Sequence, residues 1–167
     1  MVTLNTSHGD IQVELFLKDA PITAGNFLKL AKENFYDGVT FHRVIPDFMI
    51  QGGDPLSKDD DPGNDGTGGP GYAIEDEFVS GLSNTRGTLS MANSGPNTGG
   101  SQFFINMGNN SFLDYNKEPL SSKHAVFGRV VKGMDVVDAI SEAERDARDR
   151  PLEDVVIQAI VVEQPEI

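Results

Sequence analysis

Four side chains with hydrogen-bonding amide or guanidinium groups, set among apolar residues, are the part of this sequence best suited to chemistry. The run FHRVIPDFMIQGGDP carries Arg43 and Gln51, and the run GTLSMANSGPNTGGSQFFI carries Asn93 and Gln102. Neither run contains a nucleophile motif, an obvious acid–base pair or a metal-ligand cluster. A guanidinium donates hydrogen bonds, and an amide both donates and accepts them, in neither case with transfer of a proton. The two runs therefore suit a reaction that breaks no covalent bond.

The order and spacing of residues in these two runs resemble the signature stretches of the cyclophilins, which are peptidyl-prolyl cis/trans isomerases. The resemblance extends from Val2 to Val162, and its details are similar to prokaryotic members. Phe112 stands where many members carry Trp. The segment between Leu113 and His124 is several residues longer than in the shorter eukaryotic forms.

The resemblance implies roles for particular residues in the two runs and shortly after them. Arg43, Gln51 and Asn93 are expected to be catalytic, without a cofactor or a metal. A shallow pocket for the proline ring is expected from the substrate-binding set Phe48, Met49, Ala92, Gln102, Phe104, Phe112, Leu113 and His124. A cleft with apolar walls and a few convergent donors is the usual form of a ligand site. Plain core packing is the alternative for the apolar members of the set.

The expected chemistry is rotation about the peptide bond that precedes a proline. In the twisted state conjugation is lost and the prolyl nitrogen regains a lone pair, to which Arg43 can donate. Asn93 and Gln51 would hold the flanking peptide, and Gln102 would support them. His42 neighbours Arg43, but strand alternation points it to the opposite face, which predicts a structural role.

Pocket residues of this kind must be positioned by strands. Alternating apolar residues at 11–15 predict a half-buried strand. Further strands are expected from Phe41 and over residues 89–92, 102–105, 127–131 and 155–162. The residues at 155–162 are nearly all apolar, which predicts a strand buried on both faces.

Two helices complete the predicted elements. Pro21 suits the first turn of a helix, and an apolar stripe continues from Ala24 to Phe35. A shorter apolar stripe predicts a helix over 134–140. Seven or eight strands with two helices predict a mainly β protein. The resemblance implies an eight-stranded antiparallel closed barrel capped by two α-helices, and residues 1–167 contain no linker, so we expect a single domain.

Three other interpretations compete with an isomerase. The same groove could belong to a non-catalytic module that binds proline peptides, although binding alone needs no donor aimed at the prolyl nitrogen. The acidic loop at 59–66 matches part of an EF-hand calcium loop, but Gly63 and Tyr72 stand where two ligands are needed. The glycines at 66–69 could suggest a phosphate cradle, but no Lys-Ser/Thr pair follows them.

The charge of the chain limits the kinds of partner that it can bind. The formal net charge of −13 argues against nucleic acid, because phosphates would be repelled. It fits either an ordinary acidic protein or a surface adapted to high salt. The expected partners are proline-containing peptides and unfolded or partly folded proteins. The resemblance also implies binding of cyclosporin, with an affinity that is lowered because Phe112 stands in place of Trp. No disulfide is possible without Cys.

The location and the assembly of the chain are also expectations. The N-terminus has no basic region followed by a long apolar one, so a secretory signal is not expected. No stretch approaches the ~18–20 apolar residues that span a membrane. We therefore expect a cytoplasmic monomer that assists protein folding.

Overall fold

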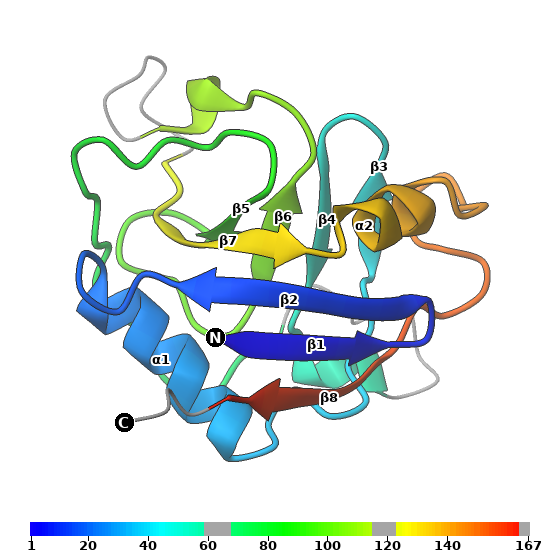
Figure 1. Cartoon of the computed structure of the whole chain (residues 1–167), viewed down its shortest axis with the longest axis horizontal. Helices are drawn as coiled ribbons and strands as arrows, with labels where there is room; N and C mark the ends of the chain where they lie inside the picture. Colours follow the sequence, from blue (N-terminus) through cyan, green and yellow to red (C-terminus); the bar gives the residue numbers. More distant parts are fainter. Residues whose placement is uncertain (59–67, 115–122, 164–167) are drawn as a thin grey trace.

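A computed structural model of the chain describes residues 1–58, 68–114 and 123–163. Eight antiparallel strands form one curled sheet, and two helices lie at different ends of it (Figure 1). In chain order the elements are β1 (Val2–Thr6), β2 (Gly9–Leu15), α1 (Pro21–Lys32), β3 (Arg43–Ile45), β4 (Met49–Gly52), η1 (Pro55–Lys58), β5 (Thr88–Met91), β6 (Phe103–Asn106), η3 (Ser111–Leu113), β7 (Val126–Lys132), α2 (Met134–Ser141) and β8 (Ile157–Val162).

The sheet has the strand order β3-β4-β6-β5-β7-β2-β1-β8, and every ladder in it is antiparallel. Its two edges are joined by the segment that precedes β3. Gly38 N–H donates to the carbonyl of Ile157, Ile157 N–H to that of Val39, and Phe41 N–H to that of Val155, at 2.8–3.0 Å. The predicted mainly β fold with eight antiparallel strands and two helices is confirmed. The expected closure of the barrel is not complete, because β3 and β8 remain the edge strands of the sheet and, among the described residues, only these few backbone bonds connect its two edges.

Aromatic side chains fill the space inside the curl. Phe27, on α1, packs edge-on against Phe103 with ring centroids 5.2 Å apart, and Tyr36 packs edge-on against the same ring at 5.7 Å. The Tyr36 hydroxyl is fully buried and donates to the carbonyl of Ser101 at 2.9 Å. Burial raises the pKa of Tyr36 well above its ordinary value, so this donor stays protonated. The core thus fixes the start of the segment that leads into β6.

The two helices cover this core at its ends. α1 begins at Pro21, as predicted, and its first free backbone N–H groups, those of Ile22 and Thr23, donate to the carboxylate of Glu77 at 3.1 and 2.8 Å. The helix ends at Lys32, so Phe35 lies beyond it although it continues the apolar stripe. α2 covers the region of β2, β3 and β4.

One strand differs from its prediction. The apolar run at 155–162 was expected to be buried on both faces, but β8 starts at Ile157 and exposes Gln158 and Val161. The prediction of two-sided burial is wrong because β8 is an edge strand that pairs only with β1 in the sheet. An edge strand of an antiparallel sheet needs just one apolar face.

Candidate functional site

The register of three neighbouring strands brings the first site residues into one row. Arg43 on β3 is paired with Gln51 on β4, and Gln51 is paired with Phe104 on β6. Residues directly opposite each other in adjacent strands project from the same face of a sheet. The hairpin β3–β4 therefore places a cation, an amide and an aromatic ring side by side on the outer face.

A small apolar cluster surrounds this row outside the main core. Met49, Phe104 and Leu113 are nearly fully buried in it, and Ile45, Phe48 and Ala92 pack against them. Met49 and Phe104 alternate along their strands with Ile50 and Ile105, which belong to the interior core. We call Ile45, Phe48, Met49, Ala92, Phe104 and Leu113 the outer apolar cluster. Core packing does not account for it, because it lies on the other face of the sheet.

A polar cavity of about 460 Å³ adjoins the cluster at Ala92. Gln51 and Gln102 form one wall of it, where Gln51 Nε2 donates to Gln102 Oε1 at 3.0 Å. Gln102 Nε2 in turn donates to the carbonyl of Gly68 at 2.9 Å, so the Gln102 carboxamide that accepts from Gln51 is itself held in place. The full lining is Gln51, Gly68, Gly69, Pro70, Tyr72, Ala92, Asn93, Ser94, Thr98, Gly100, Ser101 and Gln102.

Asn93 uses its side chain to hold the opposite wall. Its Nδ2 donates to the carbonyl of Lys123 at 2.8 Å, and its Oδ1 accepts from Gly95 N–H at 3.2 Å. Within residues 1–58, 68–114 and 123–163, the backbone N–H and carbonyl of Asn93 form no hydrogen bond. A substrate peptide could therefore be held by the Asn93 backbone, while the side chain keeps the 123–124 segment in place.

His124 lies at the border of the outer apolar cluster. Its ring packs edge-on against Phe104 with centroids 5.2 Å apart, and its Nδ1 donates to the Met91 carbonyl at 2.9 Å. Burial lowers the pKa of His124, and the hydrogen bond to Met91 partly opposes that shift. The ring is therefore an uncharged neighbour of Phe104, and the hydrogen bond to Met91 fixes its orientation.

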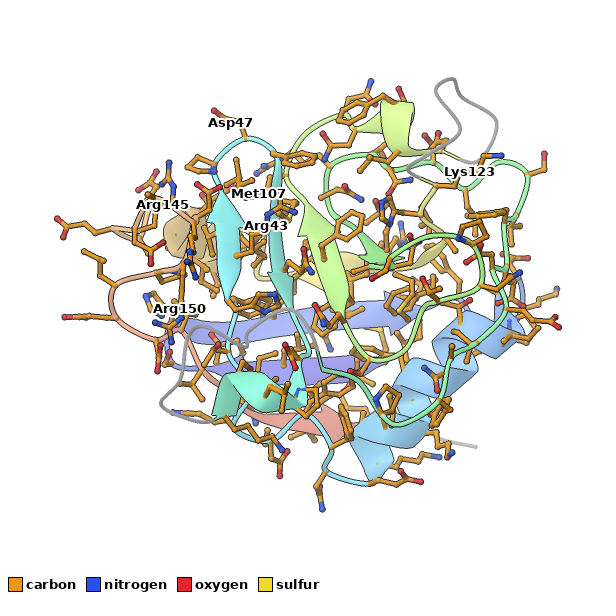
Figure 2. All side chains as sticks on the ribbon, turned by 180° about the vertical axis from the view of Figure 1, so that it is seen from behind. Arg43, Asp47, Met107, Lys123, Arg145 and Arg150 are labelled. Atoms are coloured by element: carbon orange, nitrogen blue, oxygen red, sulfur yellow. The ribbon has the colours of Figure 1, made fainter. Side chains whose placement is uncertain are left out.

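Arg43 is the exposed cation of this face. Its guanidinium has no hydrogen-bond or ion-pair partner among the described residues, whereas Arg86 and Arg129 are paired with Asp138 and Glu14. Figure 2 shows Arg43 on the β3–β4 hairpin, with Lys123 on the far side of β6. The donors of Arg43 are therefore available to a ligand.

Phe112 forms an exposed aromatic ledge beside the cluster. It is 55% exposed, and its ring stacks on Phe48 with centroids 6.1 Å apart. The η3 turn that carries it also carries Leu113, which points into the cluster. All the sequence-predicted site residues are thus brought to one face, around the cluster or the cavity.

His42 lies on the other side of the chain from Arg43, as alternation predicts. It is 8% exposed, and its Nδ1 has no hydrogen-bond partner among the described residues. Burial lowers the pKa of His42, while Asp54 opposes the shift. A neutral, buried imidazole agrees with a structural role.

The sequence analysis did not predict a group of buried polar residues that adjoins the outer apolar cluster. Asn84, Asn106, Asn110 and Asp114 are buried, although their residue types favour the surface. The only signal in the sequence was a polar residue, Asn106, at the end of an apolar strand. Nothing in the sequence indicated that the four side chains converge.

The competing metal and phosphate interpretations fall largely on residues 59–67, outside the described part of the chain. Elsewhere, the described residues bring no three His, Cys, Asp or Glu side chains together in a way that could hold a metal ion.

Comparisons with known proteins agree with this geometry. The family model for cyclophilin type peptidyl-prolyl cis-trans isomerases matches residues 1–162. The peptidyl-prolyl cis-trans isomerase ppi1 of Schizosaccharomyces pombe is 47% identical over 163 residues, covering 96% of this chain and 98% of that protein. The peptidyl-prolyl cis-trans isomerase B of Streptomyces anulatus is 46% identical over 180 residues, covering 96% and 95%.

A longer relative and a solved structure extend the comparison. This chain spans only 38% of a Streptococcus pyogenes protein named as a bifunctional phosphatase and peptidyl-prolyl cis-trans isomerase, at 45% identity. A crystal structure of a Cryptosporidium parvum cyclophilin type isomerase, determined in the presence of the dipeptide Ala-Pro, superposes with a TM-score of 0.84. It is 32% identical and covers 98% of each chain.

The fold and the outer face define a cyclophilin-like domain, and the chain belongs to the cyclophilin type peptidyl-prolyl cis-trans isomerase family. Its activity is accordingly isomerisation of peptide bonds that precede proline. In the described part of the chain, no helix has both the length and the apolar character needed to cross a membrane.

Proposed function

We propose that this domain isomerises X–Pro bonds by holding the proline ring in the outer apolar cluster while Arg43 stabilises the twisted amide. The single observation that carries this mechanism is the guanidinium of Arg43, which has no hydrogen-bond or ion-pair partner among the described residues and lies one strand from Gln51 and two from Phe104. A guanidinium keeps its protons at any working pH, so it can donate to the prolyl nitrogen when that atom regains its lone pair. The reaction then needs no proton transfer.

The energetic demand on the site is modest. The rotation barrier of a peptide bond is about 18–20 kcal/mol, and uncatalysed X–Pro exchange takes tens of seconds. Acceleration by roughly 10⁴-fold requires about 5–6 kcal/mol of transition-state stabilisation. A few hydrogen bonds that form only in the twisted state, in a site preorganised to receive them, can supply that amount.

The two halves of the site have complementary tasks. The outer apolar cluster offers an apolar ring its partly buried members Ile45, Phe48 and Ala92, packed on the nearly buried Met49, Phe104 and Leu113. The polar cavity continues from Ala92 toward Gln102. A peptide whose proline packs on the cluster would place its preceding residues over the cavity. There it could bond the backbone groups of Asn93, which have no hydrogen-bond partner in the part of the chain that the structure describes. Holding one side of the bond while the other side rotates is catalysis by positioning.

The proposal is tested with Arg43→Ala in a protease-coupled isomerase assay on a proline tetrapeptide. We expect kcat/KM to fall by about 100-fold or more, because the charge-assisted donor in the transition state is lost. Circular dichroism and thermal unfolding should stay close to wild type, since Arg43 has no hydrogen-bond or ion-pair partner in the described part of the fold.

Arg129→Ala is the matched control, because Arg129 is an exposed arginine on β7 that pairs with Glu14. It should retain full activity. Near wild-type activity of Arg43→Ala would refute the mechanism. If the wild-type protein bound the peptide but did not isomerise it, the domain would instead be a proline-peptide binding module.

We also propose that the partners are proline-containing segments of unfolded or partly folded proteins, which expose such bonds while they fold. The support is the open, exposed position of Arg43 and Phe112, which a chain segment can reach without entering the fold. The monomeric state and the cytoplasmic location remain predictions from the sequence.

A further inference from the structure

A buried network of polar side chains adjoins the outer apolar cluster, because Ser90 is paired with Phe104 and Asn106 with Met49. Asn84 is its centre and is fully buried. Its backbone N–H and its Nδ2 both donate to Asp114 Oδ1 at 2.8 Å, and its Oδ1 accepts from Ser90 Oγ at 2.6 Å and from Asn106 Nδ2 at 3.2 Å. Ser83 Oγ donates to the second oxygen of Asp114. We call Ser83, Asn84, Ser90, Asn106, Asn110 and Asp114 the buried polar network.

The network is bonded to those parts of the site that the sheet does not hold. Asn110 Nδ2 donates to the carbonyl of Phe48 at 2.8 Å, and the Asn110 carbonyl accepts from Leu113 N–H at 2.9 Å. Asn84 Nδ2 also approaches the carbonyl of His124 at 3.3 Å, and His124 N–H donates to the carbonyl of Leu113 at 3.0 Å. Phe48, Leu113 and His124 therefore all depend on it.

These three residues lie outside the strands, unlike Met49 and Phe104. Leu113 ends the η3 turn and His124 precedes β7, so no sheet ladder fixes their backbones. Phe48 precedes β4, and its carbonyl also accepts from Met107 N–H, next to β6, at 2.9 Å. Asp114 is 8% exposed and has neutral donors as its hydrogen-bond partners, with no ion pair among the described residues. A buried carboxylate is costly unless hydrogen bonds satisfy it, so this arrangement admits few alternative geometries.

We propose that Asp114 and Asn84 are positioning residues for the proline site: they fix the Leu113 and His124 walls of the outer apolar cluster without touching the substrate. Loss of the carboxylate leaves two buried donors of Asn84 without an acceptor. The walls then adopt other positions, and the proline ring loses contacts that it makes equally before and during rotation. The loss falls on peptide binding, while the donor of the chemical step, Arg43, stays in place.

The test compares Asp114→Ala with the conservative Asp114→Asn. In the latter the carboxamide oxygen can accept from both Asn84 donors, and its NH2 can donate to Ser83 once that hydroxyl rotates. We expect Asp114→Ala to raise the Kd for a proline peptide, measured by NMR titration, and KM by about tenfold, with kcat within about threefold. Asp114→Asn should stay close to wild type.

A carboxylate on the exposed surface provides the control. Asp138→Ala removes the partner of Arg86 in an exposed ion pair and should change neither constant. Unchanged peptide affinity in a folded Asp114→Ala protein, even with reduced stability, would overturn the proposal and leave the network a purely structural role. An equal loss of kcat and kcat/KM at constant KM would also overturn the proposal. Such a pattern indicates that a contact made only in the transition state is lost, which is the role proposed for Arg43.

If Asp114→Ala does not fold, the double variant Ser83→Ala with Asp114→Asn replaces it. This variant leaves the new NH2 without its acceptor while retaining the Asn84 bonds. Weaker peptide binding than in Asp114→Asn alone supports the proposal, and equal binding contradicts it. The inference rests on the proposed function, but peptide affinity is measured without turnover. A failure of the Arg43 mechanism can therefore be distinguished from a failure of this one.

Discussion

Arg43 and Phe112 are both exposed on the same face, but they offer a ligand different groups. Arg43 offers charged donors, and Phe112 offers an aromatic surface with no donor. The resemblance to family members with Trp at the position of Phe112 implies that an indole N–H meets the backbone of cyclosporin in those proteins. We therefore expect selectivity for the drug and catalysis on peptides to depend on different single residues.

We predict that Phe112→Trp tightens cyclosporin binding by about three- to tenfold, because one hydrogen bond is worth on the order of 0.5–1.5 kcal/mol net. Isothermal titration calorimetry measures this change. The kcat/KM for a proline peptide should stay nearly constant, since Arg43, Gln51 and Asn93 are unchanged. Phe35→Trp, away from the site, is the control. Equal drug affinities for wild type and Phe112→Trp would contradict the prediction.

At the scale of elements, the start of α1 depends on a residue that is remote in the sequence. Ala20 has no side-chain group that could cap the helix, and Glu77 supplies the acceptors for the N–H groups of Ile22 and Thr23. The same helix carries Asn26, which donates to the carbonyl of Gly100 and accepts from Tyr72 in the wall of the polar cavity. Loss of the Glu77 cap should therefore affect both the stability of α1 and the position of the cavity wall that Asn26 holds.

We predict that Glu77→Ala lowers the free energy of unfolding by about 1–2 kcal/mol, the range of a lost helix cap with its favourable helix-dipole interaction. Urea denaturation followed by circular dichroism measures the loss. Glu75→Ala removes an exposed carboxylate from the same segment and should change stability much less. A loss of equal size in both variants would show that general charge, rather than the cap, is responsible.

The whole molecule carries a net charge of −13, from 26 acidic and 13 basic residues. Part of the basic set is engaged in surface ion pairs such as Arg86–Asp138 and Arg129–Glu14. Pairs of this kind contribute little to stability and are screened by salt. Repulsion among the remaining carboxylates opposes folding until counterions screen it.

If the charge is an adaptation to brine, the unfolding temperature should rise steeply between dilute and molar KCl. The Debye length shrinks from about 10 Å at 0.1 M to about 3 Å at 1 M, so repulsion is removed over this range. Differential scanning calorimetry at a series of KCl concentrations tests it, with sucrose as the uncharged control. A flat melting temperature over that range would favour an ordinary acidic protein.

Much of the fold and of the site could be predicted from local patterns. Alternation at 11–15, the proline at position 21 and the apolar stripe that follows it determine elements by the geometry of strands and helices alone. The two runs around Arg43 and Asn93 carried the family resemblance, and with it the candidate site. Alternation also predicted that His42 and Arg43 face opposite ways.

Only the tertiary structure decided which side chains meet. The edge position of β8 could not be predicted, because it depends on strand order, and a run of apolar residues is equally compatible with one-sided burial. The convergence of Asn84, Asn106, Asn110 and Asp114 likewise depends on contacts between β6 and irregular segments. Hydrogen bonds between residues distant in the chain leave no period in the sequence, so the sequence determined the chemistry of this site and the fold decided what holds it in place.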